Sequence, residues 1–253
     1  MPTCYEKERE FFDRVASGSV PQRMSPGVLE RYANPRWPHL FSKEMMFYVA
    51  GDLQGKRILE IGCGEGVASV QLAYCGALVD AIDLSPISIN IASMRAQLNQ
   101  QQINFVVGDF TKDNRFATSE TYDVVWCDLV LHHLVNSLNM VINKIYRCLK
   151  TGGLFIGREP IAYASWLKTL RRFVPVHVAA TDDEQPLRKK DFEVIKGYFP
   201  YLQKRYYRIL ARADRLGANL RLLRFLARVD NLMLALPGVN ALAGNTVFWA
   251  NKR

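Results

Sequence analysis

The sequence predicts an α/β protein built on a doubly wound, mostly parallel sheet of seven strands, with an N-terminal helical lid and a C-terminal helical insertion before the last strand. Three observations predict this fold. Short apolar runs alternate with longer mixed segments through the middle of the chain, the first run ends in three glycines at alternate positions, and an apolar run lies close to the end. Runs that are apolar on both faces and separated by helix-length segments are typical of buried parallel strands joined by crossover helices.

The first fifty residues predict helices that lie beside the sheet as a lid. Four ring-bearing side chains near a proline-rich loop are candidates to roof a ligand site, with packing of the lid itself as the alternative for each: Tyr32, Trp37, His39 and Phe41. We expect residues 1–50 to form this lid, 51–160 the core of the sheet, and 161–253 further helices and the final strands of the same domain.

Between Arg57 and Pro160 the pattern predicts five strands and three helices. The strands are expected at Arg57–Ile61, Leu78–Leu84, Asn104–Val107, Tyr122–Cys127 and Gly153–Ile156. The helices are expected at Val67–Cys75, Pro86–Gln100 and Ser137–Leu149. Ser85 is a favourable N-cap, Pro86 suits a first helical turn, and the run from Lys150 to Gly153 predicts a helix stop that leads into the fifth strand.

After Pro160 the pattern is less regular. It predicts, in order, a helix, a loop, a helix, a strand, helical segments to about Leu236 and a closing strand. The expected bounds are Ala162–Phe173, Val174–Leu187, Lys189–Tyr198, Leu202–Ile209 and, for the closing strand, Thr246–Asn251.

Composition places the chain among globular proteins that bury a sizeable core. Of its 253 residues 49% are hydrophobic and 23% are charged. The start has no apolar leader, and no apolar stretch is long enough to cross a bilayer. The five cysteines have irregular spacing without a zinc pattern, which is typical of reduced thiols. We therefore expect a cytoplasmic protein without a metal site.

The positive charge is concentrated in the last third of the chain. Residues 1–160 contain 16 basic and 17 acidic side chains, whereas residues 161–253 contain 17 basic and 7 acidic ones. On a helical wheel Arg221, Arg224 and Arg228 share a narrow arc beside a wide apolar arc. Four uses stay open: a face packed on its own domain, contact with an anionic membrane surface, a cover over a lipophilic acceptor, or binding to RNA phosphates.

The stretch RILEIGCGEG, residues 57–66, runs from a strand into glycines at 62, 64 and 66. Such a turn brings backbone amides and a helix N-terminus close to a ligand. Glu60 just before it would repel a pyrophosphate and could hold an ammonium group. Asp83 at the end of the second strand is placed to accept ribose hydroxyls, and Asp109 with Phe110 after the third strand could contact adenine.

Four segments in this order, LEIGCGEG, DAIDLSP, VVGDF and YDVVWCDLVLHHL, resemble the class I S-adenosylmethionine-dependent methyltransferases of the small-molecule type. The resemblance covers roughly residues 25–160 and implies a Rossmann-like fold with S-adenosylmethionine as cofactor. The family's cofactor site then falls on the following residues: Glu60, Gly62, Cys63, Gly64, Gly66, Asp83, Leu84, Asp109, Phe110 and Cys127. In this site the glycines lie along the methionine moiety, Asp83 binds ribose, and Asp109 and Phe110 bind adenine.

The end of the fourth strand predicts the acceptor side of the site. Asp128, His132 and His133 resemble the acid and histidine of small-molecule methyltransferases, such as the phosphoethanolamine enzymes. One histidine is expected to remove the acceptor's proton. His132 is favoured, and a structural role is the alternative for either histidine. Glu159, after the fifth strand, is a candidate to orient the acceptor, with a salt bridge to Arg158 as its alternative.

The expected function is methyl transfer to an oxygen or nitrogen of a small, potentially lipophilic molecule. The chain lacks the Asn/Asp-Pro-Pro-Tyr/Phe and Pro-Cys motifs of nucleobase methylases, which weighs against nucleic acid as the substrate. An RNA- or protein-directed methyltransferase recruited through the basic C-terminal region is the main alternative. A cofactor-binding subunit without activity is a third reading, against which the intact acids and glycines argue.

Overall fold

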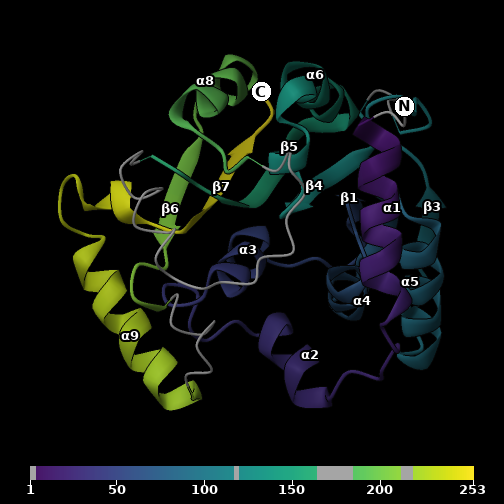
Figure 1. Cartoon of the computed structure of the whole chain (residues 1–253), viewed down its shortest axis with the longest axis horizontal. Helices are drawn as coiled ribbons and strands as arrows, with labels where there is room; N and C mark the ends of the chain where they lie inside the picture. Colours follow the sequence, from purple (N-terminus) through teal and green to yellow (C-terminus); the bar gives the residue numbers. More distant parts are fainter. Residues whose placement is uncertain (1–3, 117–119, 164–184, 212–218) are drawn as a thin grey trace.

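The computed structural model describes residues 4–116, 120–163, 185–211 and 219–253. Within these ranges one sheet has seven strands in the order β3-β2-β1-β4-β5-β7-β6 (Figure 1). Its strands are β1 Arg57–Ile61, β2 Leu78–Asp83, β3 Asn104–Val107, β4 Tyr122–Asp128, β5 Leu149–Pro160, β6 Gln203–Tyr207 and β7 Asn245–Asn251. Only β7 runs antiparallel to its neighbours. The structure thus confirms the predicted doubly wound, mostly parallel sheet.

Helices cover both faces of this sheet. The described ones are α1 Cys4–Ser17, α2 Pro26–Ala33, α3 Ser42–Ala50, α4 Val67–Tyr74, α5 Pro86–Leu98, α6 Leu138–Cys148, α8 Lys189–Tyr198 and α9 Leu220–Met233. In Figure 1, α6 and α8 lie above the sheet, and α3 and α4 lie below it. Helix α1 packs against α5 in front of the sheet, so the expected N-terminal helices are present.

The central strands have two buried faces because their apolar side chains alternate between two cores. Leu59 and Val125 pack with α6 and α8, whereas their neighbours Ile58 and Val124 pack with α3 and α4. Successive residues of a strand point to opposite faces, so a continuous apolar run can fill both cores at once. This is the physical reason that short apolar runs identified the sheet.

Most element bounds agree with the sequence to within one or two residues, and the fifth strand is the main exception. It was expected at Gly153–Ile156 and spans Leu149–Pro160. Gly152, at φ +79°, lies inside this strand rather than in a helix stop before it. The ladder to β4 is irregular between Tyr122 and Val124, and a bulge of this kind accommodates the extra residues.

The helix and loop predicted after Pro160 fall mainly on residues 164–184, which lie outside the described residues. At the margins of this range, Ile161 forms a parallel bridge with Leu187. Because β1 to β6 run in one direction, the segments that follow them meet at one edge of the sheet. Ligands of such folds bind at this carboxyl edge.

Candidate functional site

A cavity of about 460 Å³ opens at the carboxyl edge of β1 to β4. Five segments line it: one side of α1 and the loops that follow each of the four strands. The lining residues are Glu8, Phe12, Ile61, Gly62, Gly64, Ile82, Asp83, Leu84, Ser88, Gly108, Asp109, Phe110, Thr111, Lys112, Leu129, Val130, His133, Leu134, Asn136 and Ser137. Its size is within the range of small-molecule sites in proteins.

The glycine loop forms one wall of this cavity, and its three glycines are needed for different reasons. Gly62, Gly64 and Gly66 all have positive φ, at +70°, +51° and +75°. A Cβ on Gly62 would lie 2.4 Å from Val130, and one on Gly66 would lie 2.7 Å from Ala92, whereas one on Gly64 would meet nothing within 4 Å. Gly62 and Gly66 therefore allow tight packing of the protein, and Gly64 leaves the cavity side of the loop bare.

Asp83 braces the glycine loop against the next strand. Its Oδ2 accepts a hydrogen bond of 2.7 Å from the Gly64 amide, and its Oδ1 accepts one of 3.0 Å from the Ser85 amide. Burial raises the pKa of the Asp83 carboxyl, which the backbone hydrogen bonds oppose. Ser85 in turn caps α5 by accepting from the Ser88 amide at 3.0 Å. The acid predicted to bind ribose thus lies on the cavity and touches the loop.

Asp109 and Phe110 also lie where the sequence predicted them, at the end of β3. Asp109 Oδ1 accepts hydrogen bonds from the Thr111 amide at 2.8 Å and hydroxyl at 2.6 Å. Lys112 Nζ lies 3.4 Å from the other oxygen. The Phe110 ring is buried, and the Lys144 ammonium lies 5.9 Å from its centroid. A flat ring and a carboxylate therefore meet at one end of the cavity.

Four residues of the predicted cofactor site are buried and do not line the cavity: Glu60, Cys63, Gly66 and Cys127. Glu60 is 2% exposed and accepts a hydrogen bond from the Ser69 hydroxyl. Burial raises the pKa of Glu60 to about 8, although Ser69 and Lys43 oppose the shift. Burial also raises the pKa of the Cys63 and Cys127 thiols well above the usual value. These two thiols are protonated at neutral pH and are poor nucleophiles.

The two adjacent histidines have different surroundings. His132 is 4% exposed, and its Nδ1 lies 2.7 Å from Glu159 Oε2. His133 lines the cavity, where its Nδ1 lies 3.2 Å from Glu8 Oε1 and its ring packs edge-on against Phe12. The sequence favoured His132 as the base, whereas this geometry favours His133.

Glu159 organises the turn that carries both histidines. It is fully buried, and its Oε1 accepts hydrogen bonds from the amides of Val130 at 3.0 Å and Leu131 at 2.7 Å. A buried carboxylate needs such partners, because an unsatisfied one would lose hydration without compensation. Leu129, just before the turn, has φ +63°, a conformation that strains a non-glycine residue. Glu159 therefore holds a strained segment of the cavity wall, and it does not line the cavity itself.

Asp128 is likewise set back from the cavity. Its Oδ1 lies 2.6 Å from Arg158 Nε, so the salt bridge considered for Glu159 is made by Asp128 instead. Lys43 from α3 lies near this pair, and burial lowers the pKa of its ammonium, against the attraction of Asp128. Lys43, Asp128 and Arg158 are partly buried, and none of the three lines the cavity.

The roof of the cavity comes from α1. Glu8 and Phe12 line the cavity, and the four side chains proposed from the sequence as a roof do not. Tyr32 packs against Phe47, and Trp37 packs against His39. Glu8 and Phe12 were not predicted from the sequence as site residues, although their spacing of four residues places both on one face of a helix.

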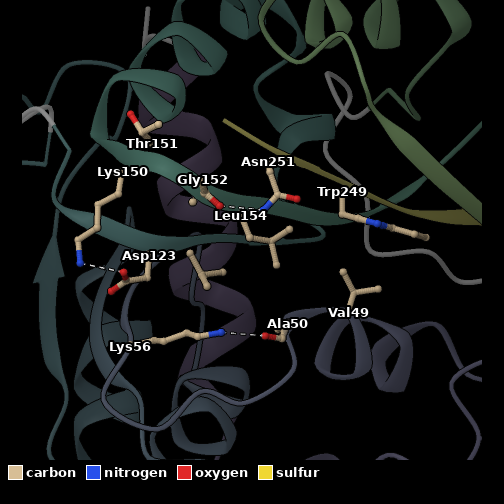
Figure 2. Close-up of a pocket in the computed structure, with 12 residues that line it drawn as sticks. Val49, Ala50, Lys56, Asp123, Lys150, Thr151, Gly152, Leu154, Trp249 and Asn251 are labelled. Atoms are coloured by element: carbon tan, nitrogen blue, oxygen red, sulfur yellow. Dashed lines mark hydrogen bonds and ion pairs between the residues drawn. The ribbon is translucent and has the colours of Figure 1, made fainter. Parts of the chain in front are cut away.

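A second cavity, of about 490 Å³, lies at the opposite edge of the sheet, near the starts of β1 and β4 (Figure 2). The two lysines that line it already have partners, because Lys150 Nζ lies 2.8 Å from Asp123 Oδ1 and Lys56 Nζ donates to the Ala50 carbonyl at 3.3 Å. Since ligands of this fold bind at the carboxyl edge, the first cavity is the candidate site. Over the described ranges no cluster of three or more His, Cys, Asp or Glu side chains is arranged to hold a metal ion.

Comparison with known proteins identifies the core of the chain. Residues 59–157 match the family model described as a methyltransferase domain. A ubiquinone biosynthesis O-methyltransferase from Glaesserella parasuis is 32% identical over 135 residues, which are 49% of this chain and 57% of the relative. The enzyme of the same name from Rickettsia typhi is 28% identical over 156 residues, 62% of this chain and 61% of the relative. The chain thus matches 57% and 61% of the length of these two relatives.

Solved structures show the same fold. A phosphoethanolamine N-methyltransferase 2 from Haemonchus contortus, solved with phosphomonomethylethanolamine and S-adenosylhomocysteine, superposes with a TM-score of 0.63 at 17% identity, over 100% of this chain and 60% of that one. A magnesium protoporphyrin IX methyltransferase from Synechocystis, solved with S-adenosylhomocysteine, gives a TM-score of 0.59 at 17% identity, over 98% and 99% of the two chains.

Proposed function

We propose that this chain, whose residues 59–157 match the model of a methyltransferase domain, is a class I methyltransferase that methylates a hydroxyl oxygen of a small lipophilic molecule. One observation carries the proposal. The bare glycine loop, the acid Asp83 at the end of β2, and His133 with its carboxylate partner Glu8 all line one cavity. The choice of oxygen is supported by the relatives, which are named O-methyltransferases.

The cavity fits S-adenosylmethionine, which would supply an electrophilic methyl group. The open side of Gly64 lets a ligand approach the backbone, and Asp83 offers a carboxylate to hydroxyl groups. Asp109 and Phe110 would hold the adenine end. Glu60 lies behind the loop and does not line the cavity, so it would not contact an ammonium group directly.

His133 would remove the proton of the acceptor hydroxyl. The Glu8 carboxylate lies against Nδ1 and would fix the tautomer that leaves Nε2 as the basic nitrogen. The oxygen then gains a methyl group as it loses its proton to the imidazole, so charge does not build up on the acceptor. The remaining contribution of the protein is alignment of the acceptor with the methyl group.

The apolar part of the lining supports a lipophilic acceptor. Leu129, Val130 and Leu134 follow β4 and lie beside His133 on the cavity wall. They would contact an apolar acceptor next to the base. Peripheral contact of α9 with a lipid surface would bring such an acceptor close to the protein.

Two measurements test the function. Calorimetry with S-adenosylhomocysteine should show binding that Asp83→Asn weakens by about 10- to 100-fold, the effect of losing a hydrogen bond to a charged group. Asp123→Asn, the same change at the opposite edge of the sheet, is the control and should bind like the wild-type protein. Equal affinity of Asp83→Asn and wild type would remove the assigned ribose contact.

The second measurement follows the methyl group. The protein is incubated with methyl-labelled S-adenosylmethionine and, in parallel, alkyl-substituted phenols, alkylamines, total RNA and a protein extract. Label in a methyl ether of a phenol supports the proposal. Label confined to RNA or protein would replace it with a macromolecule-directed methyltransferase, and label in an amine would correct the acceptor atom.

A further inference from the structure

Helix α9 presents an apolar face to solvent. Its exposed fractions are 45% for Leu222, 60% for Phe225 and 71% for Leu232, and Leu236 just beyond the helix is 59% exposed. In the part of the chain that the structure describes, α9 packs mainly against β6, and Figure 1 shows it at the outside of the molecule. We call this surface, formed by Leu222, Phe225, Leu232 and Leu236, the outer face of α9.

Three exposed arginines border the outer face on one side. At 100° per residue around the helix axis, Leu232, Phe225 and Leu222 all point within about 100° of Arg221, on one side of it. Arg228 and Arg224 lie on the other side of Arg221, within about 60° of it. The described acid of this helix, Asp230, is buried, so the outer surface of α9 combines apolar side chains with positive charge alone.

The inner side of α9 is committed to the protein. The Asp230 carboxylate accepts hydrogen bonds from the amides of Ile209 at 3.0 Å, Leu210 at 2.7 Å and Ala211 at 2.9 Å. Arg205 of β6 donates to Asn231 at 2.6 Å. These bonds fix which side of the helix faces the sheet. The apolar outer face is therefore a defined surface of the described fold.

We infer that the outer face of α9 binds the surface of an anionic lipid bilayer. Apolar side chains can enter the boundary between headgroups and acyl chains while the adjacent arginines contact lipid phosphates. Charge complementarity favours a lipid over RNA, because RNA phosphates would use the arginines and leave the leucines and Phe225 exposed. No helix among the described residues is long and apolar enough to cross a membrane.

The position of α9 suggests what this contact is for. The helix lies in the connection between the carboxyl end of β6 and the start of β7, at the same edge of the sheet as the cavity. The connection that carries α9 thus begins at the edge of the sheet where the cavity opens. If the proposed function holds, the lipid surface would be the source of the acceptor. The binding itself does not depend on that function.

Co-sedimentation of the full chain with vesicles tests the inference. The probes are vesicles of phosphatidylglycerol mixed with phosphatidylcholine, and vesicles of phosphatidylcholine alone, at low and high salt. We expect binding to the anionic vesicles at low salt and loss of binding as salt rises. Replacing Arg221, Arg224 and Arg228 together with glutamine should weaken binding roughly 100-fold, because each arginine near such a surface contributes about one kcal/mol.

Two further variants distinguish the contribution of the outer face of α9 to vesicle binding from the contribution of positive charge elsewhere on the protein. Phe225→Ser with Leu232→Ser keeps every charge and should weaken vesicle binding at least about tenfold. The control replaces Arg188, Lys189 and Lys190 with glutamine, which removes the same charge from exposed positions at the start of α8, and it should bind like the wild-type protein. Affinity for S-adenosylhomocysteine, measured in parallel, should be unchanged in all three variants and reports on the cofactor site separately.

The inference is overturned if the wild-type protein does not bind anionic vesicles at low salt. It is also overturned if the control variant loses as much binding as the variant with Arg221, Arg224 and Arg228 replaced. RNA binding that needs the arginines and not Phe225 or Leu232 would also overturn it in favour of nucleic acid. A lower melting temperature of the serine variant, without vesicle binding by the wild-type protein, would mean that another part of the chain covers the outer face.

Discussion

His133 Nδ1 lies 3.2 Å from Glu8 Oε1, so the first helix of the chain contributes a carboxylate to the wall of the candidate site. Strands β1 to β4 lie between the two residues in the sequence, and both side chains line the cavity. A carboxylate on one imidazole nitrogen fixes the ring and leaves the other nitrogen to act as a base. This arrangement makes α1 part of the proposed chemistry as well as a cover.

We predict that Glu8→Gln lowers kcat about tenfold and leaves the dissociation constant of S-adenosylmethionine unchanged, because the amide no longer stabilises the charged imidazole. Glu10→Gln is the matched control, since Glu10 is an exposed acid on the same helix. Steady-state kinetics and calorimetry on both variants give the answer. An equal effect of the two substitutions would mean that Glu8 acts only through the charge of the helix.

The same substitution should have different effects at the two neighbouring histidines, lowering turnover at one and stability at the other. His133→Gln is expected to lower turnover by about 10²–10⁴ with little change in melting temperature, because it removes the proposed base from the cavity wall. His132→Gln is expected to destabilise the fold by about 1–3 kcal/mol, because His132 is itself a hydrogen-bond partner of the fully buried Glu159 carboxylate. Thermal unfolding and labelled methyl transfer are measured on both. A large loss of turnover in a stable His132→Gln protein would return the base to the position that the sequence favoured.

The glycine loop offers a test of backbone approach. Gly64→Ala should lower the unfolding free energy by only about 1–2 kcal/mol, since φ is positive and the space is open. It should also weaken S-adenosylhomocysteine binding at least about tenfold by filling the cavity side of the loop. Gly152→Ala is the control, because Gly152 has φ +79° and open space far from the cavity. It should show the same loss of stability with full affinity.

Gly62→Ala should behave differently from both, because its Cβ would lie 2.4 Å from Val130. Overpacking adds about 1–3 kcal/mol to the strain, so this variant should lose more stability than Gly64→Ala. Equal stabilities of the two variants would contradict the packing role of Gly62.

The sheet could be predicted because its sequence signals are local. A strand buried on both faces must be apolar along its length, and Ile58, Leu59, Val124 and Val125 form such runs. The glycine loop and Asp83 were predictable for the same reason, since a ligand site at a strand end depends on residues next to that strand. The extension of β5 to Leu149 was not, because it depends on pairing with β4 and β7, which are distant in the sequence.

The proposed acceptor side of the candidate site depends on tertiary contacts that cannot be recognised in the sequence. Glu159 could have oriented a ligand or paired with Arg158, and only the fold shows it bonded to the turn that holds His132. His133 and Glu8 meet because α1 packs against α5, a tertiary contact between helices that are distant in the sequence. Spacing within Asp128–His133 could not decide which histidine faces the cavity.

Glu60, the buried acid behind the glycine loop, should make the stability of the folded protein depend on pH. Burial raises the pKa of Glu60 from 4.5 to about 8. Between these values the unfolded chain releases the proton while the folded chain keeps it, so the folded state binds more protons and its stability falls as pH rises. The fall is at most about 1.4 kcal/mol per pH unit and ends above the folded pKa.

Glu60→Gln removes this titration and can keep a hydrogen bond with Ser69. Its melting temperature relative to wild type should therefore increase as pH rises from 5 to 8, in the protein without cofactor. Glu120→Gln, at an exposed position, is the control and should track the wild-type protein at every pH. A difference between Glu60→Gln and wild type that stays constant over this range would show that Glu60 is already ionised in the folded protein, with Lys43 as the nearby cation that could compensate its charge.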